Sequence, residues 1–127
     1  MGNGTSIGRV RGLGSAHSGA HSWLQERFTG IASLLVSGYF LVSLLLLPSL
    51  NYLTVRAWIV HPVPATVMAL FVIVNFAHAR SGMLVVIEDY VHEDGSKFAA
   101  VTLLNLVAFA GAAFGVLSII RLALGGA

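Results

Sequence analysis

The chain contains no cysteine, and this absence excludes several kinds of redox site. Without thiolates the chain cannot attach haem covalently through a CxxCH motif, ligate an iron–sulfur cluster through sulfur or form an internal disulfide. Any redox cofactor that it binds must therefore be held through nitrogen or oxygen atoms, or by packing.

Charged residues are scarce as well. Only 9% of the 127 residues are Asp, Glu, Lys or Arg, whereas 57% are hydrophobic. The mean hydropathy of the chain is +0.87. A soluble domain of this size does not need so much apolar surface for its core, so the composition predicts an integral membrane protein.

Three apolar segments are long enough to cross a bilayer, which takes roughly 20 residues at about 1.5 Å of helical rise per residue. They cover about 28–47, 64–90 and 97–124, after a polar segment 1–27 and before a tail 125–127. Helices are expected because an open strand leaves backbone polar groups unsatisfied in lipid. The sequence therefore predicts an all-α membrane protein with three transmembrane helices and no room for a soluble catalytic domain.

The distribution of basic residues predicts the orientation of these spans. Four basic residues are expected on one side of the membrane and two on the other: Arg9, Arg11, Arg27 and Lys97 against Arg56 and Arg121. Because cytoplasmic loops are enriched in Lys and Arg, the N-terminus and the turn 91–95 are expected on the cytoplasmic side.

The stretch "HARSGMLVVIEDYVH", residues 78–92, places ionisable groups inside the second span. At about 100° per residue, His78, Gly82 and Asp89 lie on one face of a helix. An ionisable residue deep in a bilayer normally faces other helices and marks a functional site. Two alternatives stay open for His78: a hydrogen bond to a neighbouring helix, or ligation of a cofactor, for which Gly82 would leave room beside the helix.

If His78 ligates a six-coordinate b-type haem, this chain lacks the second axial ligand. The first and third expected spans contain neither histidine nor methionine. Met68 and Met83, in the second span, point about 80° and 140° away from His78. The second ligand would therefore come from another polypeptide.

Three further polar residues of the second span have alternative roles. Arg80 points away from His78 and lies about 15 Å inside the inner boundary, so it must snorkel, bond to another helix or meet an anion such as a haem propionate. Tyr90 lies where hydrocarbon gives way to water. It is either part of the interfacial aromatic belt or a hydrogen-bond donor to a quinone carbonyl, with Asp89 orienting it or delivering protons.

Small residues predict where the helices pack closely. Gly111 and Gly115 form a GxxxG pattern in the third span, and Ser33 and Ser37 have the same spacing in the first. Such patterns allow membrane helices to approach closely. The short turn after the second span makes spans two and three antiparallel neighbours, and Ser96 is expected to cap the third helix.

The stretch 78–92 resembles the second-helix signature of the small hydrophobic membrane-anchor subunit of succinate dehydrogenase (complex II), in which a histidine is followed by Gly-Met and later by Asp-Tyr-Val. "GAHSWLQERFTG", residues 19–30, resembles the segment that leads into the first helix of the same family. The third span resembles the family only in hydropathy.

This resemblance implies roles for particular residues. It implies that His78 is an axial ligand of haem b and that Tyr90 and Asp89 form part of the ubiquinone site. It also implies that His21 and Arg27 lie near the haem propionates, in a region where Arg80 is a further candidate.

The resemblance also implies partners and a function. The chain would form half of a helical bundle that a larger cytochrome b-type anchor subunit completes, and it would hold the flavoprotein and iron–sulfur subunits at the membrane. In such enzymes of the tricarboxylic acid cycle, succinate is oxidised to fumarate and the electrons reduce ubiquinone. The chain alone would not be an enzyme. Its other contact would be membrane lipid, and no nucleic-acid partner is expected.

Two other functions stay open. The anchor of a quinol:fumarate reductase working with menaquinone would carry a similar pattern. A transporter or adaptor subunit would use His78 and Arg80 to line a polar path, but the interiors of the first and third spans contain no ionisable residue. Because the family-like segment starts close to Met1, a bacterial cytoplasmic (inner) membrane is expected rather than a mitochondrial one.

Overall fold

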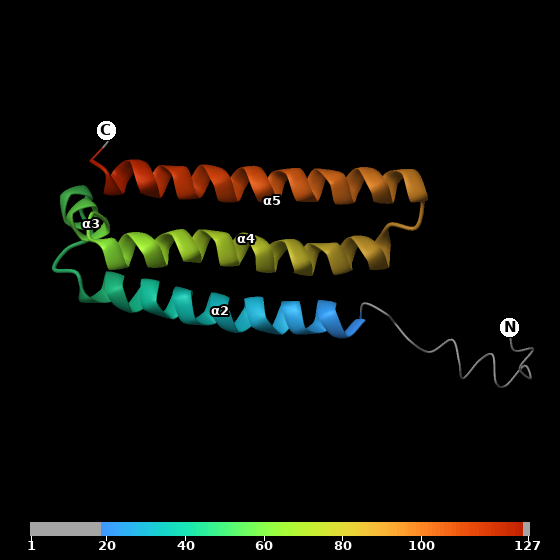
Figure 1. Ribbon diagram of the computed structural model, residues 1–127, viewed down its shortest axis with the longest axis horizontal. Helices are drawn as coiled ribbons and strands as arrows, with labels where there is room; N and C mark the ends of the chain where they lie inside the picture. The colour runs from blue at the N-terminus through green and yellow to red at the C-terminus, as the bar shows by residue number, and fades with distance from the viewer. Residues whose placement is uncertain (1–18, 126–127) are drawn as a thin grey trace, which may run out of the picture.

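The computed structural model describes residues 19–125, which form four helices (Figure 1). In chain order these are α2 (Gly19–Leu46), α3 (Tyr52–Ile59), α4 (Pro62–Tyr90) and α5 (Asp94–Ala123). No strand occurs within these residues. Because α2, α4 and α5 are each long and apolar enough to cross a membrane, the prediction of an all-α protein with three transmembrane helices is confirmed.

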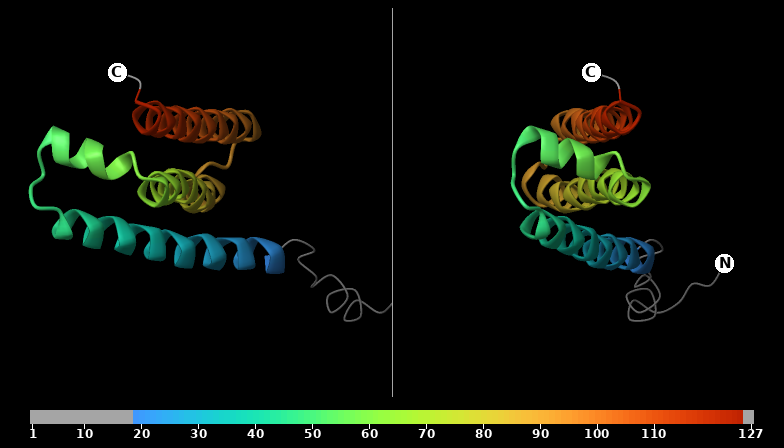
Figure 2. Two further views of the ribbon diagram at one scale, coloured as in Figure 1. Left: turned by 60° about the vertical axis from the view of Figure 1, so that its left-hand side comes forward. Right: turned by 90° about the vertical axis from the view of Figure 1, so that its left-hand side faces the viewer.

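The three long helices form a single layer with α4 in the middle (Figures 1 and 2). α4 packs against both α2 and α5, whereas the described parts of α2 and α5 do not touch each other. Among the residues that the structure describes, only Ile59, Pro64 and Ile119 are buried. A single layer cannot enclose a core, so most apolar side chains of this chain face lipid or other polypeptides.

Polar side chains join α2 to α4 inside the apolar region. The Ser33 hydroxyl donates to Oδ1 of Asn75 over 2.7 Å, and Nδ2 of Asn75 donates to the carbonyl of Phe71 over 2.8 Å. The rings of Phe40 and Phe71 pack with their centroids 5.1 Å apart. In lipid these polar groups have no water to bond, so their mutual bonding fixes how α2 and α4 face each other.

The GxxxG pattern is a site of close helix packing, as predicted, and the helix that it packs against is α4. A Cβ atom built on Gly111 would lie 2.5 Å from Cζ of Phe76, and one built on Gly115 would lie 2.7 Å from Cγ1 of Val72. No real side chain fits at such distances. The two glycines therefore allow α5 to approach α4 closely.

Two helix positions differ from the sequence-based expectation. α2 begins at Gly19 rather than near residue 28, because helix formation continues through polar residues beyond the apolar run. The expected loop between the first two spans contains the short helix α3, which Asn51 caps by accepting a hydrogen bond from the Thr54 amide over 2.9 Å. α3 lies across the end of the layer and contacts α4 and α5.

The N-terminus of α5 is capped by Glu93, in the turn that follows α4. The prediction that Ser96 caps α5 is therefore wrong. The Glu93 carboxylate accepts hydrogen bonds from the amides of Gly95 over 3.0 Å and Ser96 over 2.6 Å. Bonding from the Ser96 side chain and then from the Ser96 and Gly95 amides lowers the pKa of Glu93. The longer Glu side chain reaches these amides from one residue before the helix.

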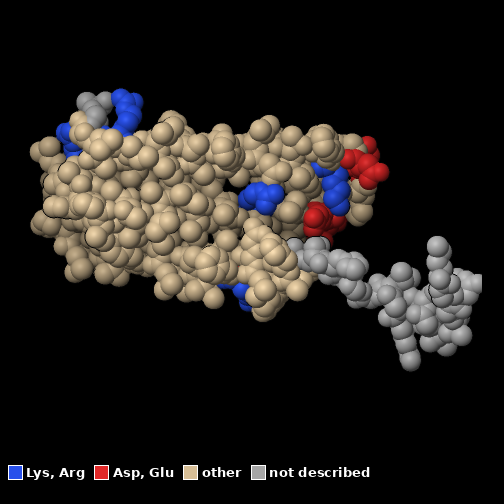
Figure 3. Space-filling model, viewed as in Figure 1, with Lys and Arg blue, Asp and Glu red and all other residues tan. Residues whose placement is uncertain are grey.

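The acidic residues gather at one end of the layer (Figure 3). All five lie at the end where α2 starts and the α4–α5 turn is found: Glu26, Glu88, Asp89, Glu93 and Asp94. The opposite end of the described chain carries Arg56 and Arg121. Between the two ends the surface is largely apolar, as a membrane-spanning protein requires.

Candidate functional site

His78 lies on α4 where this helix packs against α2. Its imidazole is half-buried, and Nδ1 lies 3.3 Å from Oγ1 of Thr29. A Cβ atom built on Gly30 would lie 3.4 Å from Cε1 of the ring. Because Gly30 has no side chain, the backbone of α2 passes directly beside the imidazole.

The two ring nitrogens of His78 have different surroundings. Nδ1 is in contact with Thr29, so the expected alternative of a bond to a neighbouring helix is present. Nε2 makes no hydrogen bond to any residue in the described part of the chain, and neither nitrogen bonds to a backbone carbonyl there. The contact with α2 thus leaves one nitrogen available for a ligand.

A hollow of about 370 Å³ opens beside the imidazole. His78 lines it together with five residues of α2: Glu26, Arg27, Gly30, Ile31 and Leu34. On α4, a Cβ atom built on Gly82 would meet no atom within 4 Å, so the surface one turn beyond His78 is open as well. The hollow therefore combines an imidazole, a cation (Arg27), a carboxylate (Glu26) and apolar side chains.

Arg27 is brought to this hollow, but His21 is not. The guanidinium carbon of Arg27 lies 5.4 Å from the ring centroid of Trp23, a cation–π contact that orients the side chain. His21 lies in the first turn of α2, is exposed, and is not among the lining residues. Of the two α2 residues that the family resemblance connects with haem propionates, the structure thus brings only Arg27 to the hollow beside His78.

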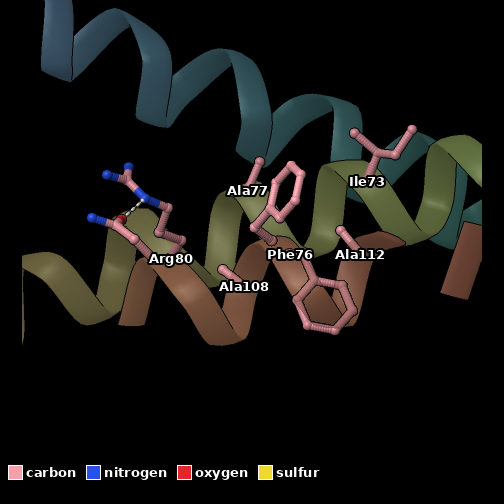
Figure 4. Close-up of a pocket in the computed structure, with 8 residues that line it drawn as sticks. Ile73, Phe76, Ala77, Arg80, Ala108 and Ala112 are labelled. Atoms are coloured by element: carbon pink, nitrogen blue, oxygen red, sulfur yellow. Dashed lines mark hydrogen bonds between the residues drawn. The ribbon is translucent and has the colours of Figure 1, made fainter. Parts of the chain in front are cut away.

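Arg80 is bonded to α5 and does not line the hollow beside His78. Its Nε atom donates to Oδ1 of Asn105 over 2.6 Å (Figure 4). This is the interhelix bonding that the sequence left open as one of three alternatives. Arg80 also lines a small hollow together with Glu26 of α2 and Glu88 of α4, so two carboxylates share this hollow with the guanidinium.

A second hollow of about 370 Å³ lies between α4 and α5 and ends at Arg80 (Figure 4). Apart from Arg80 and Asn105, its lining is apolar: Ile73, Phe76, Ala77, Ala108, Phe109 and Ala112. Asn105 was not singled out by the sequence analysis. The signal that could have found it is a lone amide in an otherwise apolar segment, since such a group needs a partner in lipid.

Asp89 and Tyr90 lie at the end of α4. Both side chains are exposed, and Tyr90 is 79% exposed. The Tyr90 hydroxyl makes no hydrogen bond to another described residue. The backbone turns away directly after Tyr90, where the Val91 amide donates to the Ile87 carbonyl over 2.9 Å. This chain alone therefore presents the two side chains at a surface and does not enclose them.

Three apolar helices in one layer, with an interhelical histidine beside a hollow, are typical of a multi-pass membrane protein. Residues 1–112 match the family described as succinate dehydrogenase/fumarate reductase transmembrane subunit. The chain belongs to this family. The match covers α2, α4 and much of α5, and therefore includes every candidate site residue.

Individual relatives agree with this assignment. The succinate dehydrogenase hydrophobic membrane anchor subunit of Paracoccus denitrificans is 31% identical over 117 residues, which cover 91% of this chain and 89% of that protein. The protein of the same name from Rickettsia conorii is 34% identical over 86 residues, or 67% of this chain and 68% of that protein. No solved structure matches the chain significantly. The resemblance to hydrophobic anchor subunits is thereby confirmed.

Proposed function

We propose that this chain anchors a succinate dehydrogenase in the membrane, supplies one axial ligand to haem b through His78, and helps to form the ubiquinone site through Tyr90 and Asp89. The observation that carries the proposal is the free Nε2 atom of His78 beside a hollow lined by Arg27. The second support is that the chain belongs to the family of succinate dehydrogenase/fumarate reductase transmembrane subunits.

The residues around His78 fit a b-type haem. Nε2 of His78 would bind the iron, Arg27 would balance the charge of a propionate, and Ile31 and Leu34 would cover part of the porphyrin. His21 and Arg80 are weaker candidates for the propionates, because neither lines this hollow. When bound, haem b supplies a one-electron carrier at this position.

The second axial ligand would come from a larger cytochrome b-type subunit. α5 contains no histidine or methionine, and the only histidine of α2, His21, lies outside the hollow. Because the helices form a single layer, a second chain can reach the surface of α4 without displacing α2 or α5. This chain would thus be half of a helical bundle that a second anchor subunit completes.

Tyr90 and Asp89 would act on ubiquinone at the cytoplasmic surface. Tyr90 lies about 18 Å along the helix axis from His78, a separation set by the rise of 1.5 Å per residue. Its free hydroxyl can donate a hydrogen bond to a quinone carbonyl, and the Asp89 carboxylate can orient it or pass protons. Reduction of ubiquinone to ubiquinol takes two electrons, delivered by the iron–sulfur subunit, and two protons from the aqueous side.

The proposed location is the bacterial cytoplasmic membrane, with the α4–α5 turn and the N-terminus facing the cytoplasm. The iron–sulfur and flavoprotein subunits would then dock at the end of the layer that carries Asp89 and Tyr90. The family also includes fumarate reductase subunits, which run the reverse reaction. The names of the relatives favour succinate oxidation for this chain.

The experiment is to replace His78 by alanine, purify the complex by a tag on another subunit and record its optical spectrum. Loss or alteration of the haem b bands is expected while the subunits still co-purify. His92→Ala is the matched control, because His92 is an exposed histidine just beyond the same helix, and its spectrum should be unchanged. An unaltered haem spectrum in His78→Ala would refute the ligand assignment.

A further inference from the structure

We propose that Thr29 is a positioning residue for His78. Its hydroxyl oxygen accepts a hydrogen bond from Nδ1–H of the imidazole and thereby keeps the lone pair of Nε2 free for the haem iron. The contact joins α2 to α4 across 49 positions of sequence, with 3.3 Å between Oγ1 and Nδ1. This inference rests on the proposed function and adds a residue that neither the sequence pattern nor the resemblance singles out.

The direction of this hydrogen bond follows from the other contacts of Thr29. Oγ1 lies 2.9 Å from the carbonyl oxygen of Gln25 and 3.1 Å from that of Glu26. A carbonyl oxygen can only accept, and the hydroxyl has a single hydrogen, which these two acceptors take. Both carbonyl oxygens lie closer to Oγ1 than Nδ1 of His78 does, at 3.3 Å, so we infer that the hydroxyl hydrogen points to the carbonyls and that His78 is the donor to the lone pair of Oγ1.

The direction inferred for this hydrogen bond implies one tautomer of the imidazole. A neutral imidazole carries one N–H, and the nitrogen without it is the one that binds a metal. With the hydrogen on Nδ1 directed at Thr29, the free lone pair is on Nε2. If the Thr29 hydroxyl instead donated to Nδ1, the hydrogen of the ring would be on Nε2 and would block ligation.

Thr29 also fixes the orientation of the ring. The β-branched threonine has few rotamers in a helix, and its bonds to the preceding turn hold the hydroxyl in place. Gly30 brings the backbone of α2 against the same ring, so the imidazole is held by two successive residues. When the ring nitrogen that does not bind the metal donates its N–H to an acceptor, the imidazole becomes a stronger electron donor to the metal. The reduction potential of the metal centre is thereby lowered.

The helices do not depend on this contact for their packing. Ser33 and Asn75 form a separate hydrogen bond about one turn away, and Phe40 packs on Phe71 further along. Removal of the Thr29 hydroxyl should therefore leave α2 and α4 together. Its effect should be confined to the imidazole and whatever the imidazole binds.

The test compares Thr29→Val, which keeps the shape and removes the hydroxyl, with Thr29→Ser, which keeps the hydroxyl. Thr102→Val, an exposed threonine on α5, is the control for loss of a hydroxyl elsewhere in the membrane region. The whole complex is purified, and the midpoint potential of haem b and the electron paramagnetic resonance spectrum of its oxidised form are measured. We expect Thr29→Val to raise the potential and alter the spectrum, and Thr29→Ser and Thr102→Val to match the unmodified complex.

Three outcomes would overturn the inference. The first is that Thr29→Val matches the unmodified complex in both measurements. The second is that the midpoint potential of Thr29→Ser shifts as far as that of Thr29→Val. The third applies if Thr29→Val loses haem while the subunits co-purify: loss of haem from Thr29→Ser as well would refute the inference, whereas retention there supports it. The proposed ligation fails separately, through an unchanged spectrum in His78→Ala, so the two failures can be told apart.

Discussion

At the scale of single residues, the proposed function depends on two side chains with polar atoms that the described helices leave without a partner. His78 is in contact with Thr29 through Nδ1, and its Nε2 has no hydrogen-bond partner among residues 19–125. Tyr90 presents its hydroxyl at a surface. Groups of this kind are open to cofactors, substrates or neighbouring chains.

Replacement of Tyr90 by phenylalanine tests the quinone role. One hydrogen bond of this kind contributes about 1 kcal/mol, so kcat/KM for quinone reduction should fall about fivefold or more. Succinate oxidation measured with an artificial electron acceptor should be unchanged, because that reaction bypasses the anchor. Tyr52→Phe, at the opposite end of the layer, is the matched control. Equal loss of both activities would mean that the Tyr90 hydroxyl is structural.

The capping role of Glu93 predicts a pH dependence. The pKa of Glu93 is lowered by its hydrogen bonds to Ser96 and Gly95, so its contribution to stability is fully present above the ordinary value of 4.5. That contribution is lost as the pH falls through the lowered pKa. In thermal unfolding, Glu93→Ala should therefore lower the melting temperature at neutral pH and do so less below pH 4.5. A difference that stays constant across this range would contradict the role of the charged carboxylate.

At the scale of elements, the sequence determines the existence of the helices better than their ends. Hydropathy finds α2, α4 and α5 because each must match the thickness of the bilayer. It misses the start of α2 at Gly19, since a helix can begin well before the apolar run when no residue there breaks it. It misses α3 because eight residues are too few to form a span, although Asn51 gives a capping signal.

The same contrast applies to the site. The helical period predicts that His78 and Gly82 share a face, and the GxxxG pattern predicts that α5 packs closely against another helix. Neither Thr29 nor Asn105 could be found in this way, because each acts on a residue of another helix. Such pairings depend on how the helices are arranged in space, which a local periodicity does not contain.

The close packing of α4 and α5 predicts a strong effect of one added methyl group. In Gly115→Ala the new Cβ would lie 2.7 Å from Cγ1 of Val72, a stiff β-branched side chain, so the helices must move apart. Overpacking of this kind costs typically 1–3 kcal/mol, and the melting temperature of the purified complex should fall. Gly38→Ala is the control, because a Cβ there meets no atom within 4 Å. Addition of Val72→Ala should restore much of the loss, and equal melting temperatures for the two glycine variants would contradict this packing.

At the scale of the whole molecule, the single layer explains why the chain needs partners. Its central helix is covered by α2 and α5 along its sides, but almost nothing in the described chain is fully buried. A layer of this kind becomes a bundle only when a second layer packs on it. The single layer of helices thus accounts for three features: the uncovered surface of α4, the accessible Nε2 of His78 and the exposed side chain of Tyr90.

The proposed orientation can be tested directly because the chain has no cysteine of its own. Single cysteines placed at Ser49 and at His92 lie at opposite ends of the layer. A membrane-impermeant maleimide added from the periplasmic side should label Ser49→Cys and spare His92→Cys. Labelling after solubilisation and unfolding shows that both thiols are reactive. The reverse pattern would place the α4–α5 turn and Tyr90 on the periplasmic side.

The central claim is that His78 provides half of a haem site that another chain completes. The most direct measurement is a cryo-electron microscopy map of the intact complex at a resolution that shows side chains. We expect porphyrin density at Nε2 of His78, with a histidine of a different polypeptide at the other axial position. A map in which this imidazole faces lipid, or in which both ligands of the iron come from other residues, would contradict the account.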